Sequence, residues 1–434
     1  MPGGGIRLAT TTNNPPPTRL LDLTRLASRP GRQPTGIDRV EMAYLQHLLD
    51  LDAPIWGLVR LSVGYVLLDR GGLTSFLHRV QGQTAWGKPR LLLRLARRLT
   101  PLQRQVQSDL WRLAAFRVLG RRLPRLLTHL PTGIGYLNVG HSNLTEHTLN
   151  ALDNHPDTRI TVMIHDTIPL DHPEYSQPEA VDRFRGLLRR VMHHADLILC
   201  NSIKTREDVQ RHMAEFAKEE STEAEPSEET ITAALPRMVI TPLGITMPRP
   251  DPAALPVDLP EDRPLFVVLG TIEPRKNHKM LVEIWEKWDE KEDGPRPVLG
   301  IIGARGWRNE DLFDRLNRTP LRGRDLFEWQ GLPDKAVAAV LARANALLFP
   351  SFAEGYGLPP VEAAALQTPV ISADLPSVKE SLGDFPVYLD AGDSYSWKKA
   401  IKSRVEVGRS VTEGMRGFAP PFWEEHFKVV LKMT

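Results

Sequence analysis

The sequence has a single cysteine among its 434 residues. It therefore cannot form an internal disulfide or a cysteine-based zinc cluster. Cys200 ends the apolar run 197–200, which favours a small core residue over a nucleophile. His193 and His194 stand near Asp196 but lack a third ligand at metal spacing. We therefore expect a helix end there, and no metal site.

Long hydrophobic runs are also missing. No apolar stretch approaches the roughly 18–20 residues that a membrane-spanning helix needs. The first residues contain Gly3 to Gly5 and Pro15 to Pro17 in place of an apolar signal core. We expect a cytoplasmic location and a disordered segment over residues 1–17.

Two common nucleotide-binding motifs are absent. The sequence contains neither GxGxxG nor GxxxxGK followed by Ser or Thr. An NAD-dependent oxidoreductase and a P-loop NTPase are therefore not supported.

The net charge is only +2, but the charge is unevenly distributed. Between Lys88 and Arg125 there are eleven Lys or Arg residues and one acid, Asp109. We predict two basic amphipathic helices here, the second over 110–127. Such helices bind anionic membrane surfaces. The alternative is a helical insertion, about 88–127, that packs on its own domain. No nucleic-acid motif accompanies the charge, so we expect no nucleic-acid partner.

Short apolar strands alternate with helices twice along the chain, which predicts two parallel sheets. A Pro-rich stretch separates the two series. Residues 215–229 carry seven Glu and one Lys and predict a disordered loop. The expected segments are a disordered N-terminus 1–17, an N-terminal Rossmann-like domain 18–248 with an acidic loop at about 215–232, a linker 249–264, a C-terminal domain 265–414 and a C-terminal helix 415–434.

Two carboxylates, Glu354 and Glu362, flank a Gly-bearing loop that follows the apolar strand 346–349. A turn that enters a helix after a parallel strand is where open α/β sheets bind phosphorylated ligands. Carboxylates do not hold phosphate, but they accept hydrogen bonds from sugar or ribose hydroxyls. The combination predicts a nucleotide-sugar site.

Two further loops leave strands at the same relative point. Arg275 and Lys276 follow the strand 265–269 and suit a diphosphate, since Arg offers a fork and Lys a point charge. The turn 331–334 follows the strand 327–330, and Asp334 could cap the next helix. Loops at the carboxyl ends of parallel strands converge, so we expect one site.

These residues also carry a family resemblance. The run from Leu265 to Asp390 closely resembles the donor-binding domain of retaining glycosyltransferases of family 4, which have the GT-B fold. The N-terminal half resembles it more thinly, and Gly303-Ala-Arg-Gly306-Trp307 resembles a segment of mannosyltransferase-like members. The matching blocks are Gly270-Thr-Ile-Glu-Pro-Arg275-Lys276-Asn277, Gly331-Leu332-Pro333-Asp334, Phe349-Pro350-Ser351, the E-x7-E pair Glu354 and Glu362, Thr368-Pro369-Val370-Ile371, and in the N-terminal half Thr35-Gly36-Ile37-Asp38-Arg39, His165-Asp166-Thr-Ile-Pro169 and Asn201-Ser202.

The resemblance implies two domains that face each other across a cleft, with a C-terminal helix that crosses back to the first domain. It also implies roles for individual residues. The implied catalytic residues are Glu354, His165, Arg275 and Lys276. The implied donor-binding residues are Glu362, Gly36, Gly270, Thr271, Leu332, Gly355, Tyr356, Gly357 and Leu358, and the acceptor-side candidates are Asp166 and His141.

In this interpretation Arg275 and Lys276 neutralise the leaving diphosphate, so no metal and no cofactor are needed. Glu362 accepts from ribose hydroxyls and Glu354 from donor-sugar hydroxyls. Thr271, Glu273 and Pro274 replace the usual Gly-Arg start of the family, which leaves the contacts to the base open.

The expected function is retaining transfer of a sugar from a nucleotide-diphosphate donor to a glycan or polyprenyl-linked acceptor in cell-surface polysaccharide synthesis. GDP-mannose is favoured as donor over UDP- or dTDP-sugars. The alternatives are a transferase that uses one of those sugars on another acceptor, a GT-B epimerase, and a non-catalytic glycan-binding scaffold. Contact with the inner face of the cell membrane, through residues 88–127, goes with the first interpretation of the basic helices.

Overall fold

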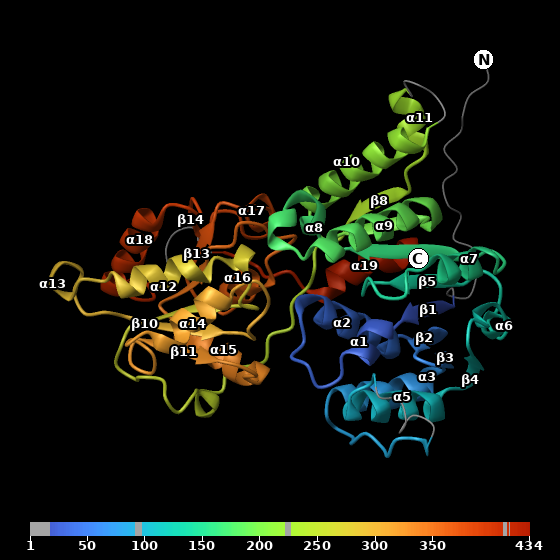
Figure 1. Cartoon of the computed structure of the whole chain (residues 1–434), viewed down its shortest axis with the longest axis horizontal. Helices are drawn as coiled ribbons and strands as arrows, with labels where there is room; N and C mark the ends of the chain where they lie inside the picture. Colours follow the sequence, from blue (N-terminus) through green and yellow to red (C-terminus); the bar gives the residue numbers. More distant parts are fainter. Residues whose placement is uncertain (1–17, 92–97, 222–226, 411–414, 416) are drawn as a thin grey trace.

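The computed structural model describes residues 18–91, 98–221, 227–410, 415 and 417–434. The chain forms two α/β domains that lie side by side, each with one central sheet (Figure 1). The predicted pair of parallel-sheet domains is confirmed.

The first sheet has eight strands in the order β4-β3-β2-β1-β5-β6-β7-β8. The pairs β2–β3 and β3–β4 are antiparallel, and the others are parallel. The strands are β1 (Arg19–Asp22), β2 (Ile55–Leu61), β3 (Gly64–Leu68), β4 (Phe116–Leu119), β5 (Gly135–Asn138), β6 (Arg159–Ile164), β7 (Leu197–Cys200) and β8 (Arg237–Ile240).

Helices cover both faces of this sheet. They are α1 (Thr24–Ser28), α2 (Gly36–Asp50), α3 (Arg70–Val80), α5 (Pro101–Leu113), α6 (Leu123–Leu127), α7 (Glu146–Asp153), α8 (Ile168–Asp171), α9 (Pro178–His194), α10 (Ile203–Glu220) and α11 (Glu228–Ala233). The helix α2 begins with a capping box, in which Thr35 is the N-cap and Asp38 accepts from the Thr35 amide at 2.8 Å.

The second sheet is fully parallel, with six strands in the order β11-β10-β9-β12-β13-β14. The strands β9, β10 and β12 are continuous apolar runs because both faces of a parallel sheet are covered. The strands are β9 (Leu265–Leu269), β10 (Val298–Ile302), β11 (Leu326–Trp329), β12 (Ala346–Phe349), β13 (Val370–Ala373) and β14 (Val387–Leu389), and the helices are α12 (His278–Glu286), α13 (Glu290–Asp293), α14 (Glu310–Arg318), α15 (Asp334–Arg343), α16 (Leu358–Ala365), α17 (Pro376–Leu382) and α18 (Ser394–Val407).

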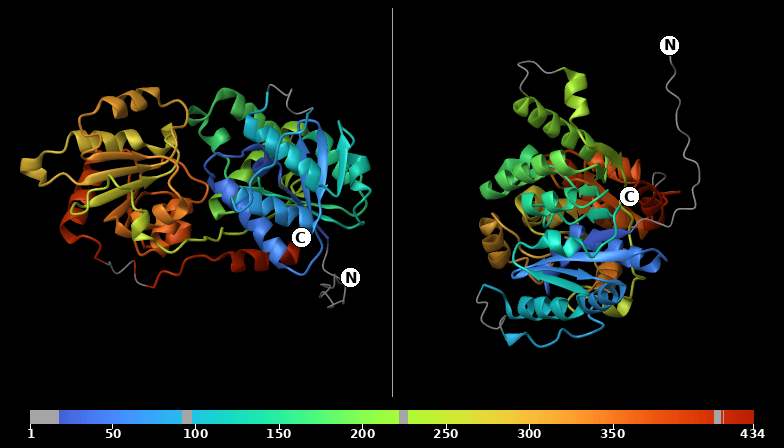
Figure 2. Two further views of the ribbon diagram at one scale, coloured as in Figure 1. Left: turned by 90° about the horizontal axis from the view of Figure 1, so that it is seen from below. Right: turned by 90° about the vertical axis from the view of Figure 1, so that its right-hand side faces the viewer.

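After α18 the chain returns from the second domain to the first, where its last helix, α19 (Trp423–Met433), lies (Figure 2, left). It packs on α2, where the hydroxyl of Tyr44 lies 2.7 Å from Nε2 of His426. The rings of His47 and Phe427 stack with their centroids 3.8 Å apart. The expectation of a helix that crosses back to the first domain is confirmed.

The prediction of a second basic helix over 110–127 is wrong. The range is not one helix: residues 110–113 end α5, Phe116–Leu119 form the edge strand β4, and residues 123–127 form the separate short helix α6. Phe116 and Val118 alternate with the exposed Arg117 and Leu119, which is a strand pattern. Residues 92–97 of the first predicted basic helix lie outside the described residues.

The predicted acidic disordered loop is also wrong where the structure describes it. Residues 215–220 belong to α10, and residues 228–232 to α11, while residues 222–226 lie outside the described range. Phe216 is fully buried, and Arg189 of α9 stacks on its ring at 4.5 Å and bonds Glu220 at 2.7 Å. These tertiary contacts extend the helix into the acidic run, and α10 and α11 project from the body of the first domain (Figure 1).

Candidate active site

The order of the second sheet creates a switch point between β9 and β12. From β9 the chain continues to β10 and β11 on one side, and from β12 to β13 and β14 on the other. Ligands of open α/β sheets bind outside the carboxyl ends of the strands at such a point. The loops 270–277 and 350–357 leave β9 and β12 there.

These two loops are joined by an ion-pair cluster. Arg275 lies 2.8 Å from Glu354 and 2.6 Å from Glu273, and Lys276 pairs with the other oxygen of Glu354. Lys276 is 8% exposed and lies 5.0 Å from the Phe349 ring centroid. The sequence predicted the two cations and the glutamate in separate roles; the structure shows them in one cluster.

Burial and pairing act in opposite directions on the charges of this cluster. Burial alone raises the pKa of Glu354, but Arg275 and Lys276 outweigh it and bring this pKa to about 2. Burial lowers the pKa of Lys276, partly offset by Glu354. Burial raises the pKa of Glu273. Glu354 is therefore a carboxylate at neutral pH, and together with Glu273 it neutralises Arg275 and Lys276.

Glu362 lies in α16 and pairs with a different cation, Arg39 of α2 in the first domain. The same guanidinium lies 3.1 Å from Asp334 at the start of α15. The side chain of Glu362 is 5% exposed and that of Asp334 is 72% exposed. Burial raises the pKa of Glu362, and Arg39 works against that rise. No role was predicted for Arg39, although it ends the motif 35–39.

Two histidines of the first domain stand side by side at the carboxyl edge of its sheet. The rings of His141 and His165 have centroids 5.1 Å apart. Nε2 of His165 lies 2.7 Å from the carbonyl of Val139, and Nε2 of His141 lies 2.8 Å from that of Met163. Because a carbonyl only accepts, each Nε2 carries the hydrogen and each Nδ1 is left as an acceptor.

Both histidines are neutral at physiological pH. Burial lowers the pKa of His165 to about 4 and that of His141 to about 3. Burial raises the pKa of the neighbouring Asp166, and the charge of Arg275 in the second domain opposes that rise. The side chains of the two domains therefore influence each other electrostatically at this point.

The loop after β12 touches the first domain directly. A Cβ added at Gly355 would lie 2.0 Å from the carbonyl oxygen of His165 and 2.8 Å from Cβ of Asp166. The hydroxyls of Ser202 and Thr205 donate to the carbonyl of Gly355, at 2.9 and 3.2 Å. Glycine is required at this position because any side chain would push the domains apart.

The other predicted donor-side residues lie around these loops. Gly36 faces Leu358 across the domains, since its added Cβ would lie 3.3 Å from the Leu358 side chain. Gly357 has φ +95° at the N-cap of α16, and Tyr356 bonds the carbonyl of Leu243 at 2.8 Å. Gly270 has φ +144° and backs onto the Lys276 side chain.

Thr271 and Leu332 complete the predicted set. The methyl group of Thr271 lies against Gly306, since a Cβ added at Gly306 would lie 2.8 Å from that methyl group. Leu332 precedes α15 and is half-buried. Asp334 is the first residue of α15 and Pro333 its N-cap, so the predicted Asp334 cap is wrong.

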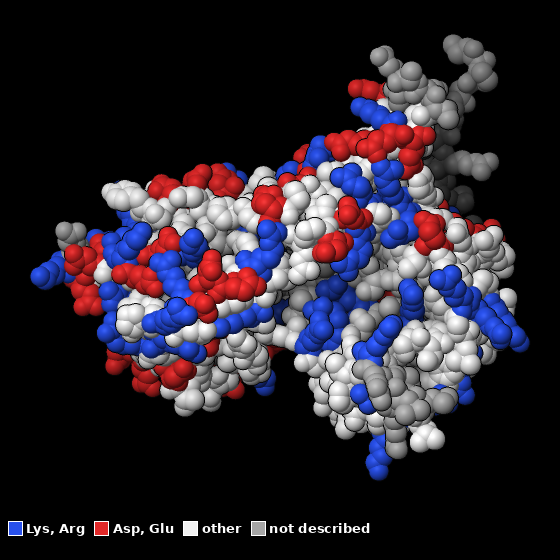
Figure 3. All heavy atoms as spheres, viewed as in Figure 1, with Lys and Arg blue, Asp and Glu red and all other residues white. Residues whose placement is uncertain are grey.

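The two residues that follow Gly306 form another contact between the domains. Nε1 of Trp307 donates to the carbonyl of Tyr175 at 3.2 Å, and Arg308 donates to that of Ser176 at 2.7 Å. Tyr175 in turn stacks on Phe352. Figure 3 shows Lys and Arg side chains gathered around the hollow where the two domains meet.

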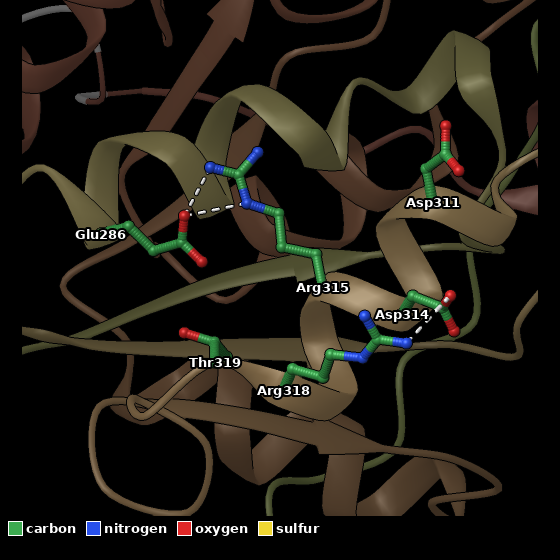
Figure 4. Close-up of a pocket in the computed structure, with 6 residues that line it drawn as sticks. All are labelled: Glu286, Asp311, Asp314, Arg315, Arg318 and Thr319. Atoms are coloured by element: carbon green, nitrogen blue, oxygen red, sulfur yellow. Dashed lines mark hydrogen bonds and ion pairs between the residues drawn. The ribbon is translucent and has the colours of Figure 1, made fainter.

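A shallow surface pocket lies away from this site, on α12 and α14 (Figure 4). Its charged side chains neutralise one another, as Arg315 pairs with Glu286 and Arg318 with Asp314. Within the described residues, no group of three or more His, Cys, Asp or Glu could hold a metal ion. Nor do the described helices include one long and apolar enough to cross a membrane.

The two facing sheets and the crossing helix define the GT-B fold. HepE from Anabaena, solved with UDP and glucose, superposes with a TM-score of 0.59 at 13% identity, covering 96% of this chain and 99% of HepE. Sucrose-phosphate synthase from Thermosynechococcus elongatus superposes with a TM-score of 0.57 at 14% identity, covering 95% and 97%. At this identity the likeness concerns the fold.

Residues 256–407 match the family model described as glycosyl transferases group 1. The serotype-specific mannosyltransferase WbdA of Escherichia coli is 31% identical over 244 residues, which is 55% of this chain and 29% of WbdA. O-antigen chain mannosyltransferase B of E. coli is 31% identical over 126 residues, 29% of this chain and 32% of that protein. The matches thus span about a third of these relatives, and together with the fold they support a GT-B glycosyltransferase.

Proposed function

We propose that this chain is a retaining glycosyltransferase that moves a sugar from a nucleotide-diphosphate donor to a glycan or polyprenyl-linked acceptor in cell-surface polysaccharide synthesis. The observation that carries the proposal is the cluster of Arg275, Lys276 and Glu354 at the switch point of the second sheet. It opposes the neutral His165 of the first domain across the contact at Gly355.

The two cations are proposed to receive the diphosphate. Glu354 and Glu273 neutralise them in this structure. A bound diphosphate would therefore replace the ion pairs with these two glutamates by ion pairs with its own oxygens. Cations fixed beside the departing phosphate stabilise the charge that develops as the glycosidic bond breaks. This arrangement would require no metal and no cofactor.

The remaining donor contacts follow from the same geometry. Glu354, freed from Lys276, would accept from hydroxyls of the transferred sugar, and Nδ1 of His165 is an acceptor for another hydroxyl. Glu362 would accept from the ribose hydroxyls once Arg39 leaves it. The amides of residues 356–358 at the start of α16 complete a cradle for phosphate.

Mannose is the favoured sugar and GDP-mannose the favoured donor. The support is the mannosyltransferase names of the relatives and the segment 303–307, whose Trp307 lies at the domain contact. A screen of GDP-, UDP- and dTDP-sugars for thermal stabilisation tests the donor, because a ligand stabilises the folded state that binds it. We expect GDP-mannose to raise the melting temperature most.

The activity itself is tested with Lys276→Ala and Glu362→Ala. Each variant should lose transfer of labelled sugar while keeping its circular dichroism spectrum and a cooperative melting transition. Lys279→Ala is the matched control, because Lys279 is exposed on α12 only three residues further along. Full transfer by both site variants would contradict the proposal. The anomeric configuration of the product, read by NMR, tests retention.

We also propose peripheral contact with the anionic inner face of the cell membrane. The support is the run 117–125 along β4 and α6, in which Arg117, Arg121, Arg122 and Arg125 are exposed together with Leu119, which is 60% exposed. The apolar face of α5 contributes nothing, since Val106 and Leu110 are buried against the domain. Arg122→Gln with Arg125→Gln should reduce sedimentation with phosphatidylglycerol vesicles, and unchanged sedimentation would refute the contact.

A further inference from the structure

A second pocket lies at the carboxyl edge of the first sheet, away from the donor cluster. It is formed by the β2–β3 turn, the residues that follow β4, and the first turn of α7. We name it the turn pocket. The residues that matter for its chemistry are Arg60, Val63, Tyr65, Arg121 and His147.

The turn pocket has a fixed frame. The amide and hydroxyl of Ser62 both bond Oε1 of Gln107 on α5, at 3.2 and 2.6 Å. Gly64 has φ +153°, and a Cβ there would lie 2.0 Å from the carbonyl of Val118. The β2–β3 turn is therefore held against β4 and α5 whether or not a ligand is bound.

Positive charge in the turn pocket lacks a partner. Arg60 and Arg121 are exposed and line it, and neither forms an ion pair with a carboxylate of the described chain. Nε2 of His147 is buried and has no hydrogen-bond partner there either. The amide end of α7 adds its partial positive charge. Glu146 also lines the turn pocket and opposes this charge, although Oε2 of Glu146 lies 3.4 Å from Nε2 of His194.

Apolar surface adjoins these cations. Val63, in the β2–β3 turn, is 39% exposed, and Leu119, at the end of the neighbouring β4, is 60% exposed. The combination of an arginine pair with exposed aliphatic side chains suits an anion attached to an apolar or uncharged chain. Two guanidinium groups favour phosphate over a single carboxylate because of their number of donors.

The turn pocket opens at the same sheet edge as His165. His165 follows β6, and the turn pocket follows β2; in the sheet β6 is separated from β2 by the two strands β5 and β1. Neighbouring strands lie about 4.8 Å apart, so the separation along the sheet is about 15 Å. The backbone amide of Arg60 donates to the Thr24 hydroxyl at 3.0 Å, which fixes the end of β2 against α1.

We propose that the turn pocket binds a phosphate group of the acceptor, while the reacting end of the acceptor lies at His165. The acceptor class is therefore a glycan that carries a phosphate or diphosphate. The identification of the ligand as an acceptor rests on the proposed function, but the binding of phosphate to the turn pocket does not depend on it.

The test is calorimetric titration of the full chain with inorganic pyrophosphate. Wild type should show two binding events, one at the Arg275–Lys276 cluster and one at the turn pocket. Lys276→Ala should remove the first event only. Arg60→Gln with Arg121→Gln should weaken the second at least about tenfold, since charge-assisted hydrogen bonds are lost. Both arginines are exposed, so the fold should persist.

Arg122→Gln with Arg125→Gln is the matched control, because these arginines are exposed beside the turn pocket but do not line it. A less than twofold change in the Arg60/Arg121 variant, or an equal loss in the control, would overturn the proposal. A third outcome separates the two proposals. If the Arg60/Arg121 variant loses the second event but Lys276→Ala still shows both events, the donor site is contradicted and the turn pocket is supported.

Vesicles distinguish the source of the phosphate. Phosphatidylcholine vesicles are compared with and without phosphatidic acid. If the Arg60/Arg121 variant loses more binding to phosphatidic-acid vesicles than to phosphatidylglycerol vesicles of equal charge, the phosphate is presented on a lipid. If only pyrophosphate binding depends on this pair, the acceptor is diffusible. Either result supports the turn pocket.

Discussion

Glu354 and Glu362 are both buried glutamates of the E-x7-E pair, yet their environments shift their pKa values in opposite directions. Glu354 has two cations at its oxygens and a pKa of about 2, whereas burial dominates at Glu362 and raises its pKa. The fall of the Glu354 pKa from its ordinary value of 4.5 corresponds to about 3 kcal/mol of stability. The two residues should therefore respond to acid with opposite signs.

The first prediction follows from these signs. The stability that ionised Glu354 contributes is complete above its unfolded pKa and is lost as pH falls from about 4.5 towards 2. The melting temperature of Glu354→Gln should thus approach that of wild type as pH falls from 6 to 3. For Glu362, whose folded pKa is raised, ionisation costs stability, so wild type should gain on Glu362→Gln as pH falls. Parallel pH profiles for both variants would contradict this account.

The second prediction concerns Gly355, where the limit is steric. Gly355→Ala would place a methyl group 2.0 Å from the His165 carbonyl and force the loop away from the first domain. Displacements of about 1 Å in a reacting geometry can cost about 100-fold in rate. We expect transfer to fall by about that factor, with the melting temperature lowered slightly.

Gly186→Ala is the control for Gly355→Ala. Gly186 lies in α9, where an added Cβ meets only the flexible end of Arg190 at 3.3 Å. Alanine is also the better helix former. Equal losses of transfer in the two variants would show that the close approach at Gly355 is unimportant.

At the scale of elements, α2 joins the domains through Arg39, which bridges α15 and α16. Arg39→Gln should destabilise the chain because it leaves the buried Glu362 without its cation. Adding Glu362→Gln should then restore about 1–2 kcal/mol, since the unpaired charge is removed and the pair was half-exposed on the arginine side. Chemical unfolding of the single and double variants measures this coupling.

Asp334 supplies the internal comparison for Arg39. It contacts the same guanidinium but is 72% exposed, so water can replace the arginine. Adding Asp334→Asn to Arg39→Gln should restore nothing. Restoration by Asp334→Asn as large as that by Glu362→Gln would mean that burial of Glu362 is not the cause.

Much of the element order could be read from the sequence, because the parallel strands are continuous buried runs. β9 and β12 have the predicted bounds, and the loops that follow them meet as expected. β4 was missed because its exposed Arg117 resembled the basic face of a helix. The length of α10 was missed because Phe216 and Arg189, on different helices, stabilise its acidic end.

The ion pairs of the site could not be read from the sequence. Topology predicts that Arg275, Lys276 and Glu354 share one sheet edge, but not that the carboxylate neutralises both cations. The pair of Arg39 with Glu362 joins residues 323 positions apart in different domains. Whether such groups meet depends on how the two domains pack, and no local pattern encodes that.

At the scale of the whole molecule, the domains meet through a few polar contacts and one crossing helix. Arg39 with Glu362 lies at one contact, Gly355 with His165 at a second, and Trp307 with Arg308 at a third. Interfaces of this polar kind between domains permit relative motion. Because Arg39 of the first domain pairs with Glu362, whose carboxylate the proposed donor would use, donor entry should require the domains to separate.

The last prediction tests this opening. Trp307→Ala with Arg308→Gln removes two hydrogen bonds to the first domain, from Trp307 to Tyr175 and from Arg308 to Ser176, and touches neither the donor cluster nor α19. The variant should therefore populate the open arrangement, with a larger radius of gyration in small-angle scattering and faster amide exchange over residues 350–358. A bound nucleotide-sugar should reverse both changes, because it bridges the domains. Arg318→Gln, on the exposed side of α14, should behave as wild type. Scattering and exchange identical to wild type in the Trp307/Arg308 variant would mean that the remaining contacts hold the closed arrangement alone.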